Sequence, residues 1–275
     1  MEGTAMSLFG TGLGIEEDRS ITISVLEFDV LWEHLGLQDM PVVLRVASMG
    51  ETNAERTRLV DAAWNSLANK GLGSRMDYDP RLTQMLRVIA HPDSEVDGRI
   101  WCQPHTRVLA ATKDGAAVLV VFAGNLLTFR DAAITGLPRE VLTQLPDLPP
   151  GPGESITLPS ADFEAAARDA TTPAQFRQNL IERGIREIDA ASLTAMIGDL
   201  TGQGQFGVAF RDRWGARVRG EHVVNFFDTE QGRYVQLRKN SPNGMWSTIS
   251  PVDSRRMHQH LSNLHDETSA AVARR

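Results

Sequence analysis

A group of arginines around one tryptophan is the local feature of this sequence best suited to binding chemistry. Its members lie at the end of one predicted strand and in the segment before the next: Arg211, Arg213, Trp214, Arg217 and Arg219. Arginine and tryptophan are enriched at the energetic centres of protein–protein interfaces. One interpretation is a long hairpin loop that clamps a partner of complementary charge. The alternative is a solvated hairpin whose tryptophan folds back onto the sheet, and interface composition alone favours the first.

The residues that could bind a metal or catalyse a reaction show no comparable grouping. His258 and His260 point to different sides of a predicted helix, whereas His258 and His265 lie two turns apart, too far for one ion. Cys102 has no base near it in the sequence, which favours a buried thiol over a nucleophile. We therefore predict no metal, no cofactor and no enzymatic activity. The alternative hypothesis is an enzyme whose site is assembled between two distant parts of the chain.

Composition limits the class of protein further. The chain has 275 residues and a formal net charge of -7, which disfavours a nucleic-acid-binding protein because phosphate neutralisation requires clustered positive charge. Its single cysteine cannot form an intrachain disulfide and fits a reducing compartment. We identify no apolar run of membrane-spanning length and no signal-peptide pattern at the N-terminus. These features predict a cytoplasmic, soluble protein without membrane insertion.

One order of predicted elements occurs twice along the chain. Each copy has a helix that ends at a glycine, a second helix, and three strands joined by short turns. The first copy comprises a helix ending at Gly71, a helix over 82–89, and strands over 98–101, 108–112 and 117–122. The second comprises a helix ending at Gly184, a helix over 193–200, and strands over 206–210, 223–227 and 234–237. The repetition predicts a pseudo-symmetric molecule.

Other segments complete the expected organisation. Strands are predicted over 21–25 and 41–46, with a helix over 28–35 between them. Four prolines and two glycines within 145–153 predict a linker without helix or sheet. We expect flexible tails over 1–20 and 269–275, an N-terminal half over 21–135, a Pro/Gly-rich linker over 136–158 and a C-terminal half over 159–268.

Strands joined by short turns pair antiparallel, because a parallel return needs a crossover of about a dozen residues. Helices grouped ahead of the strands in each copy indicate an α+β class, with helical layers against an antiparallel sheet. The exposed edge strands of such a sheet could also pair between chains, which leaves a homo-oligomeric structural protein as a further alternative.

With both copies laid out, the chain resembles the EspG family of chaperones of type VII (ESX) secretion. The resemblance extends over roughly 21–264 and rests on the order and spacing of several segments. They are the strand and helix over 21–36, DMPVVL at 39–44, DPRL at 79–82, AVLV at 117–120, LLTF at 126–129, DTEQGR at 228–233 and WSTISP at 246–251.

The resemblance implies a central antiparallel sheet with two flanking helical bundles related by a pseudo-twofold axis. It also implies a cytosolic chaperone, a monomer or weak homodimer, that binds the hydrophobic helical tip of a PPE protein in a PE–PPE heterodimer without catalysing a reaction. The family contact surface uses the sheet, the second bundle and the loop between the second and third strands. The matching positions are Ile185, Ile188 and Ser192 in the second bundle, Arg217 or Arg219 on the sheet, and Gln103 and His105 in the loop.

Overall fold

A computed structural model describes residues 20–274. Apart from residue 20, the tail expected over 1–20 lies outside the described residues. The first half contains β1 (Ile21–Ser24), α1 (Val25–His34), α2 (Asn53–Asn69), α3 (Pro80–Ala90), β2 (Ser94–Ile100), β3 (Thr106–Lys113), β4 (Ala116–Ala123), β5 (Leu126–Asp131) and α4 (Leu137–Leu142). The second contains β6 (Ile156–Pro159), α5 (Ser160–Arg168), α6 (Pro173–Glu182), α7 (Glu187–Ile197), β7 (Leu200–Arg211), β8 (Arg217–Arg219), β9 (Val224–Thr229), β10 (Gly232–Ser241), β11 (Gly244–Pro251) and α8 (Ser254–Ala273).

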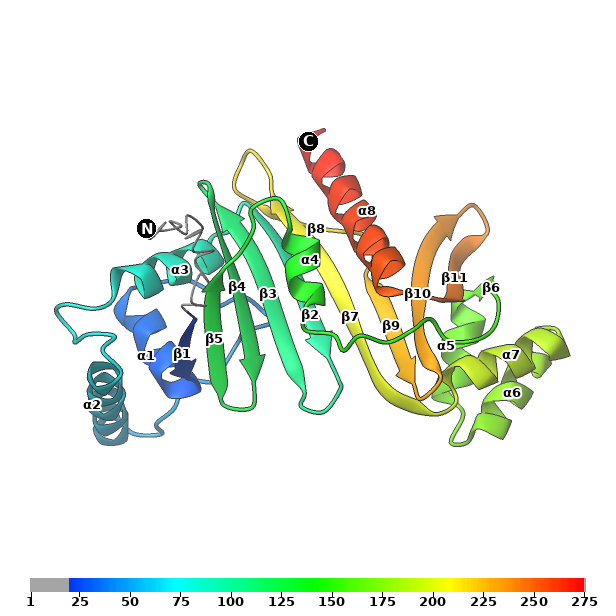
Figure 1. Ribbon diagram of the computed structural model, residues 1–275, viewed down its shortest axis with the longest axis horizontal. Helices are drawn as coiled ribbons and strands as arrows, with labels where there is room; N and C mark the ends of the chain where they lie inside the picture. The colour runs from blue at the N-terminus through cyan, green and yellow to red at the C-terminus, as the bar shows by residue number, and fades with distance from the viewer. Residues whose placement is uncertain (1–19, 275) are drawn as a thin grey trace, which may run out of the picture.

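The strands form one 11-stranded antiparallel sheet whose order is a mirror image about its centre. The order is β1-β5-β4-β3-β2-β7-β9-β10-β11-β6, with β8 added beside β7. Each half therefore starts with its own edge strand, β1 or β6, and closes on it with its last strand, β5 or β11. The two halves meet where β2 pairs with β7, so the predicted pseudo-twofold axis passes between these strands (Figure 1). The predicted α+β class is confirmed.

The first elements of the two halves also resemble each other residue by residue. The segment ITISVLEF, which begins at Ile21, has its counterpart in ITLPSADF, which begins at Ile156. In both, the threonine hydroxyl hydrogen-bonds a threonine across the sheet edge: Thr22 to Thr128 at 3.0 Å, and Thr157 to Thr248 at 2.9 Å. The two halves therefore begin with the same local structure at the two sheet edges.

The two predicted glycine stops have the same geometry. Gly71 and Gly184 both adopt positive φ, which glycine tolerates without steric cost. The next residue in each case donates its N–H to the carbonyl five positions back, Leu72 to Leu67 at 2.9 Å and Ile185 to Leu180 at 3.1 Å. This is the Schellman arrangement that satisfies the last carbonyls of a helix. Both α2 and α6 therefore end through the same local chemistry.

Helices cover the two faces of the sheet differently. On one face, here called the bundle face, α1–α3 pack over β3–β5 and α5–α7 pack over the strands at the other end. The opposite face is covered near its centre by α4 and α8, which contact each other and lie in front of the sheet in Figure 1. The centre of the bundle face, over β2, β7 and β9, lies between the two bundles.

Three expectations require correction. Residues 41–46 form a turn without strand pairing, in which Leu44 N–H bonds Pro41 O at 2.9 Å. The expected linker over 136–158 begins with α4 and ends within β6. The expected tail over 269–275 is helical through Ala273, since the buried Thr268 anchors α8 and helix-favouring alanines come after it.

The segment 145–153 is held against the sheet. Arg233 N–H donates to Pro149 O at 2.9 Å, and Gly151 N–H donates back to Arg233 O at 3.1 Å. The hydroxyl of Tyr234 donates to Pro152 O at 3.0 Å. The prolines prevent regular structure, as expected, and β10 satisfies the backbone groups that a linker would leave to water.

Candidate partner-binding surface

A row of polar side chains crosses the open centre of the bundle face. Successive registers place Arg107, Arg99, Gln205, Asn225 and Gln236 opposite one another on β3, β2, β7, β9 and β10. Asn225 Nδ2 donates to Gln236 Oε1 at 3.0 Å, and Gln236 Nε2 donates to Ser247 Oγ at 3.1 Å. One end of this polar row is thus satisfied by amide and hydroxyl groups, whereas the other end consists of two arginines.

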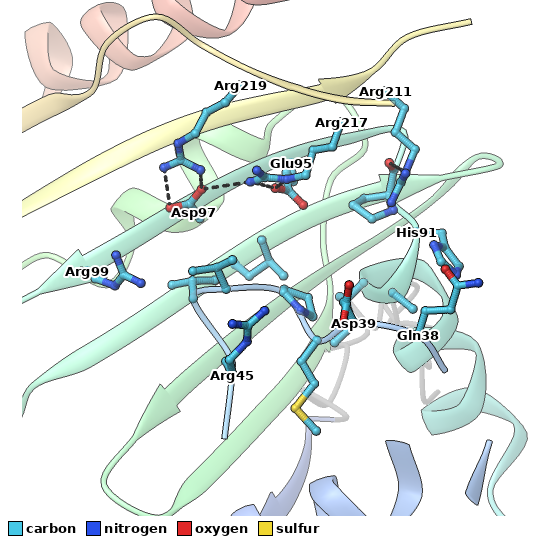
Figure 2. Close-up of a pocket in the computed structure, with 18 of the residues that line it drawn as sticks. Gln38, Asp39, Arg45, His91, Glu95, Asp97, Arg99, Arg211, Arg217 and Arg219 are labelled. Carbon is cyan, nitrogen blue, oxygen red and sulfur yellow. Dashed lines mark hydrogen bonds and ion pairs between the residues drawn. The ribbon is translucent and has the colours of Figure 1, made fainter. Parts of the chain in front are cut away.

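Two acidic side chains precede Arg99 on the same face of β2. Arg217 Nε donates to Glu95 Oε1 at 2.7 Å, and Arg219 makes two bonds to Asp97, at 2.5 and 3.0 Å (Figure 2). Burial raises the pKa of Glu95 by more than the charge of Arg217 lowers it. Arg217 and Arg219, which we expected in a loop, lie in β8 and form ion pairs with Glu95 and Asp97 of β2.

The segment 38–45 and this part of the sheet enclose a groove of about 680 Å³ on the bundle face (Figure 2). Its charged lining residues are Arg45, Arg99, Arg211, Arg217, Arg219, Asp39, Glu95 and Asp97. Five arginines thus face three carboxylates in a chain whose net charge is -7. The groove is a locally positive surface on a negative protein.

The hairpin between β7 and β8 is held by its own polar groups and by a bond to the segment before β2. Arg211 donates to Pro92 O at 3.1 Å and to Gly215 O at 2.7 Å, and Asp212 Oδ1 accepts from the N–H of Trp214 at 2.9 Å. The Trp214 side chain is 77% exposed, and the Arg213 guanidinium lies 5.1 Å from its ring centre. Trp214 therefore projects from the turn, in contrast to the alternative in which it folds back onto the sheet.

The loop between β2 and β3 forms a second cleft, of about 570 Å³, at one end of the central strands. Gln103 and His105 line it and are exposed, as is Trp101, which the sequence interpretation missed. Trp101 N–H donates to Gln203 O at 2.8 Å, which fixes the loop beside the start of β7. Leu200, 42% exposed, adds apolar surface at the beginning of β7.

The residues expected on the second bundle lie on or near α7. Ile188 is 71% exposed, whereas Ser192 is half-buried and Ile185 packs against the core of that bundle. Because α7 leads directly into β7, its C-terminus lies at the same end of the central strands as the β2–β3 loop (Figure 1). This end of the sheet is here called the α7 end. The structure therefore brings the loop and the C-terminus of α7 together there.

The hairpin tip lies at the other end of the central strands. β2 runs antiparallel to β7, with Ile100 opposite Gly204 and Ser94 opposite Phe210. Gln103 and His105 come after the end of β2, whereas Arg213 and Trp214 come after the end of β7. Strands rise by about 3.3 Å per residue, so the length of β2 separates the two groups by roughly 20 Å. The predicted site residues thus form two groups on opposite ends of the sheet.

A sequence profile of the EspG family matches residues 24–263 of this chain. The chain belongs to the EspG family. Among solved structures, this EspG-family chain is similar to the Mycobacterium tuberculosis type VII secretion system chaperone EspG5, determined in complex with a PE25–PPE41 dimer. The TM-score is 0.69 at 17% sequence identity, over 89% of this chain and 95% of the other, which establishes the shared fold. No curated protein sequence matches the chain.

One side-chain arrangement in the EspG-family chain has the composition of a hydrolytic triad. Ser94 Oγ lies 3.1 Å from His265 Nε2, and His265 Nδ1 lies 3.5 Å from Asp266 Oδ1. Ser94 is buried, and it lines neither the groove nor the β2–β3 cleft. A nucleophile must reach its substrate, so we interpret this contact as a bond that attaches α8 to β2.

The remaining chemistry-bearing groups of the EspG-family chain are also isolated. Burial raises the pKa of the Cys102 thiol, and the charge of Asp228 adds to this effect, which makes the thiol a poor nucleophile at neutral pH. Within residues 20–274, no three potential metal ligands are grouped together. Over the same residues, no helix combines the length and apolar character that a bilayer crossing requires.

Proposed function

We propose that this protein is a cytosolic chaperone of a type VII secretion system that binds the helical tip of a PPE protein within a PE–PPE heterodimer. The client is this heterodimer, and the chaperone keeps its apolar tip covered until export. Membership of the EspG family carries the proposal. The solved relative EspG5, with the same fold, is described in complex with a PE–PPE dimer.

The α7 end of the bundle face suits such a client. It combines the exposed apolar side chains of Trp101 and Leu200 with the polar groups of Gln103 and His105, and the exposed Ile188 lies farther out, near the start of α7. Apolar anchors within a polar rim are the usual anatomy of a protein–protein interface. We therefore place the main client contact on this end of the sheet, with the polar row as its floor.

The sheet edges do not favour the homo-oligomeric alternative. The edge strands β1 and β6 have four residues each, and each leads directly into a helix. Short edge strands limit edge-to-edge pairing between chains. A chaperone that acts as a monomer or weak homodimer fits this arrangement.

The test is coexpression of the chain with the PE–PPE pair encoded beside its gene, followed by size-exclusion chromatography. We expect one co-eluting complex with wild type. Trp101→Ala should weaken client binding about tenfold or more, because tryptophan at the centre of an interface is a typical hot spot. Met76→Ala removes a 96% exposed apolar side chain in the α2–α3 connection and is the matched control. Failure of every adjacent PE–PPE pair to co-elute would refute the proposal.

A further inference from the structure

Two arginines of the polar row lie directly opposite each other. Arg99 on β2 and Arg107 on β3 are register partners on the bundle face. Like charges in this position repel and destabilise a sheet. The guanidinium of Arg107 stacks 3.8 Å from the ring centre of Phe122, and its Nη1 donates to the backbone oxygen of Arg45 at 3.2 Å. The three residues Arg45, Arg99 and Arg107 are here called the arginine triad.

The arginine triad has no internal counter-charge. Within residues 20–274, none of its guanidinium groups has a carboxylate oxygen within 4.0 Å, whereas Arg217 and Arg219 each do. Burial lowers the pKa of Arg107, and the nearby charge of Arg99 lowers it further. The hairpin explains the difference, because β8 ends at Arg219 and does not extend to the level of Arg99.

The position of Arg99 joins two parts of the surface. It lines both the groove and the β2–β3 cleft, where Trp101, Gln103 and His105 also lie. Arg45 reaches into the groove from the 38–45 segment, opposite the sheet (Figure 2). An acidic group bound between these arginines would therefore be continuous with the apolar contact assigned to Trp101.

We propose that the arginine triad binds aspartate or glutamate side chains at the helical tip of the client. This inference rests on the proposed function and adds the chemistry that the client must present. Guanidinium groups bind carboxylates through paired, charge-assisted hydrogen bonds, and an arriving carboxylate would relieve the repulsion between Arg99 and Arg107. The net charge of -7 makes this positive groove a local exception, which favours an acidic protein segment over a nucleic acid.

The primary test is Arg99→Gln, measured with the PE–PPE pair that co-elutes with wild type. We expect its affinity for the pair to fall about tenfold or more, with a weaker dependence on salt, because a charge-assisted bond is lost. The melting temperature should stay equal or rise, since the substitution relieves like-charge repulsion. A purely structural role for Arg99 would instead lower the melting temperature. The control is Arg255→Gln on α8, an exposed arginine on the opposite face.

Charge reversal gives a second and more specific readout. Arg99→Glu should abolish binding, and replacement of one acidic residue at the client tip by arginine should restore it at least partly. If wild type binds the pair and both Arg99 variants bind equally well, the inference is wrong while the proposed function stands. If no pair binds wild type, the proposed function fails and this inference falls with it.

Discussion

The two halves of the sheet share one strand order but differ in how the chain continues from their central strands. After β2, a short loop leads directly to β3, whereas after β7 the chain adds the hairpin with β8 before reaching β9. The pseudo-twofold axis places these connections at opposite ends of the same strand pair. One additional hairpin thus makes the surface of a repeated scaffold asymmetric.

The β7–β8 hairpin belongs to the second half, but its main contacts are with β2 of the first half. Its arginines neutralise Glu95 and Asp97, which belong to β2, and it stops before Arg99. The charges of Glu95 and Asp97 on β2 are therefore compensated by ion pairs, whereas the charge of Arg99 is not. Variants in the two halves and at the strand pair that joins them should therefore differ in their effects, and the expected effects are given in decreasing size.

The largest effect is expected at the buried ion pair of the second half. Arg233 and Asp228 are 2% and 3% exposed, and their contacts include a 2.7 Å bond from Nε to Oδ1. Arg233→Ala would leave the Asp228 charge buried without a partner, at a cost of about 3–5 kcal/mol in the free energy of unfolding. Denaturant unfolding measures this. On the same strand, Arg238→Ala breaks a pair with the exposed Glu164 and should cost less than about 1 kcal/mol.

A smaller loss is expected where the halves join. A Cβ on Gly98 of β2 would lie 2.6 Å from ring carbons of Phe206 on β7 and 2.8 Å from Val108 Cγ1. Gly98→Ala should lower the free energy of unfolding by about 1–3 kcal/mol through overpacking. The double variant with Phe206→Leu should lose less than the sum of the two single losses. If the two losses in the free energy of unfolding are simply additive, no clash exists between position 98 and Phe206.

Two buried glutamates should respond to pH with opposite signs. Burial of Glu27 is outweighed by hydrogen bonds from Lys70 and Ser24, so its pKa falls below the ordinary value of 4.5, whereas burial raises the pKa of Glu95. Glu27 therefore stabilises the fold above pH 4.5, and this contribution disappears as the pH falls through its lowered pKa. Ionisation of Glu95 instead costs stability as the pH rises through its raised pKa.

Melting temperatures between pH 3.5 and 8 test these signs. Glu27→Gln should lose about 1 kcal/mol relative to wild type near pH 7 and match it in acid. Glu95→Gln should match wild type in acid and gain relative to it as the pH rises. Equal pH profiles for the two variants would show that the carboxylates have similar environments.

The smallest effect is expected at the hairpin tip. Trp214→Ala removes an exposed side chain and should change the free energy of unfolding by less than about 0.5 kcal/mol. A client seated at the α7 end should keep its affinity within about twofold, in contrast to Trp101→Ala. Titration of the PE–PPE pair measures both. A large loss of affinity with Trp214→Ala would extend the interface to the opposite end of the sheet.

Local signals in the sequence were sufficient for the repeat but not for the site. Glycine stops and turn residues act within a few positions, so Gly71, Gly184 and the Asp114-Gly115 turn were predictable. The segment 41–46 has the composition of a strand and lacks a neighbour to pair with, which no local pattern reveals. The family resemblance, spread along the whole chain, was confirmed.

The candidate surface depended on long-range pairing. Glu95, Asp97 and Arg99 alternate with less polar residues, which was a usable signal for a polar face of β2. Whether each of them has an ion-pair partner depends on β8, which is more than 100 residues away in the chain. Likewise, Arg213 and Trp214 are close to Arg217 in sequence but belong to the hairpin tip, whereas Arg211 pairs with Arg217 and lines the groove. Proximity in sequence thus grouped residues that the fold assigns to different places.

The pairing of β2 with β7 also limits how the chaperone can work. Seven consecutive register pairs join the halves, and β10 holds the 145–153 segment in place. A movement of the two helical bundles toward each other would strain the backbone hydrogen bonds between β2 and β7. We therefore expect the gap between the bundles to keep a constant width. A gap of constant width would admit only clients of matching size. It would also provide no opening or closing motion that could expel a bound client. Release would then depend on dissociation or on another component that competes for the client.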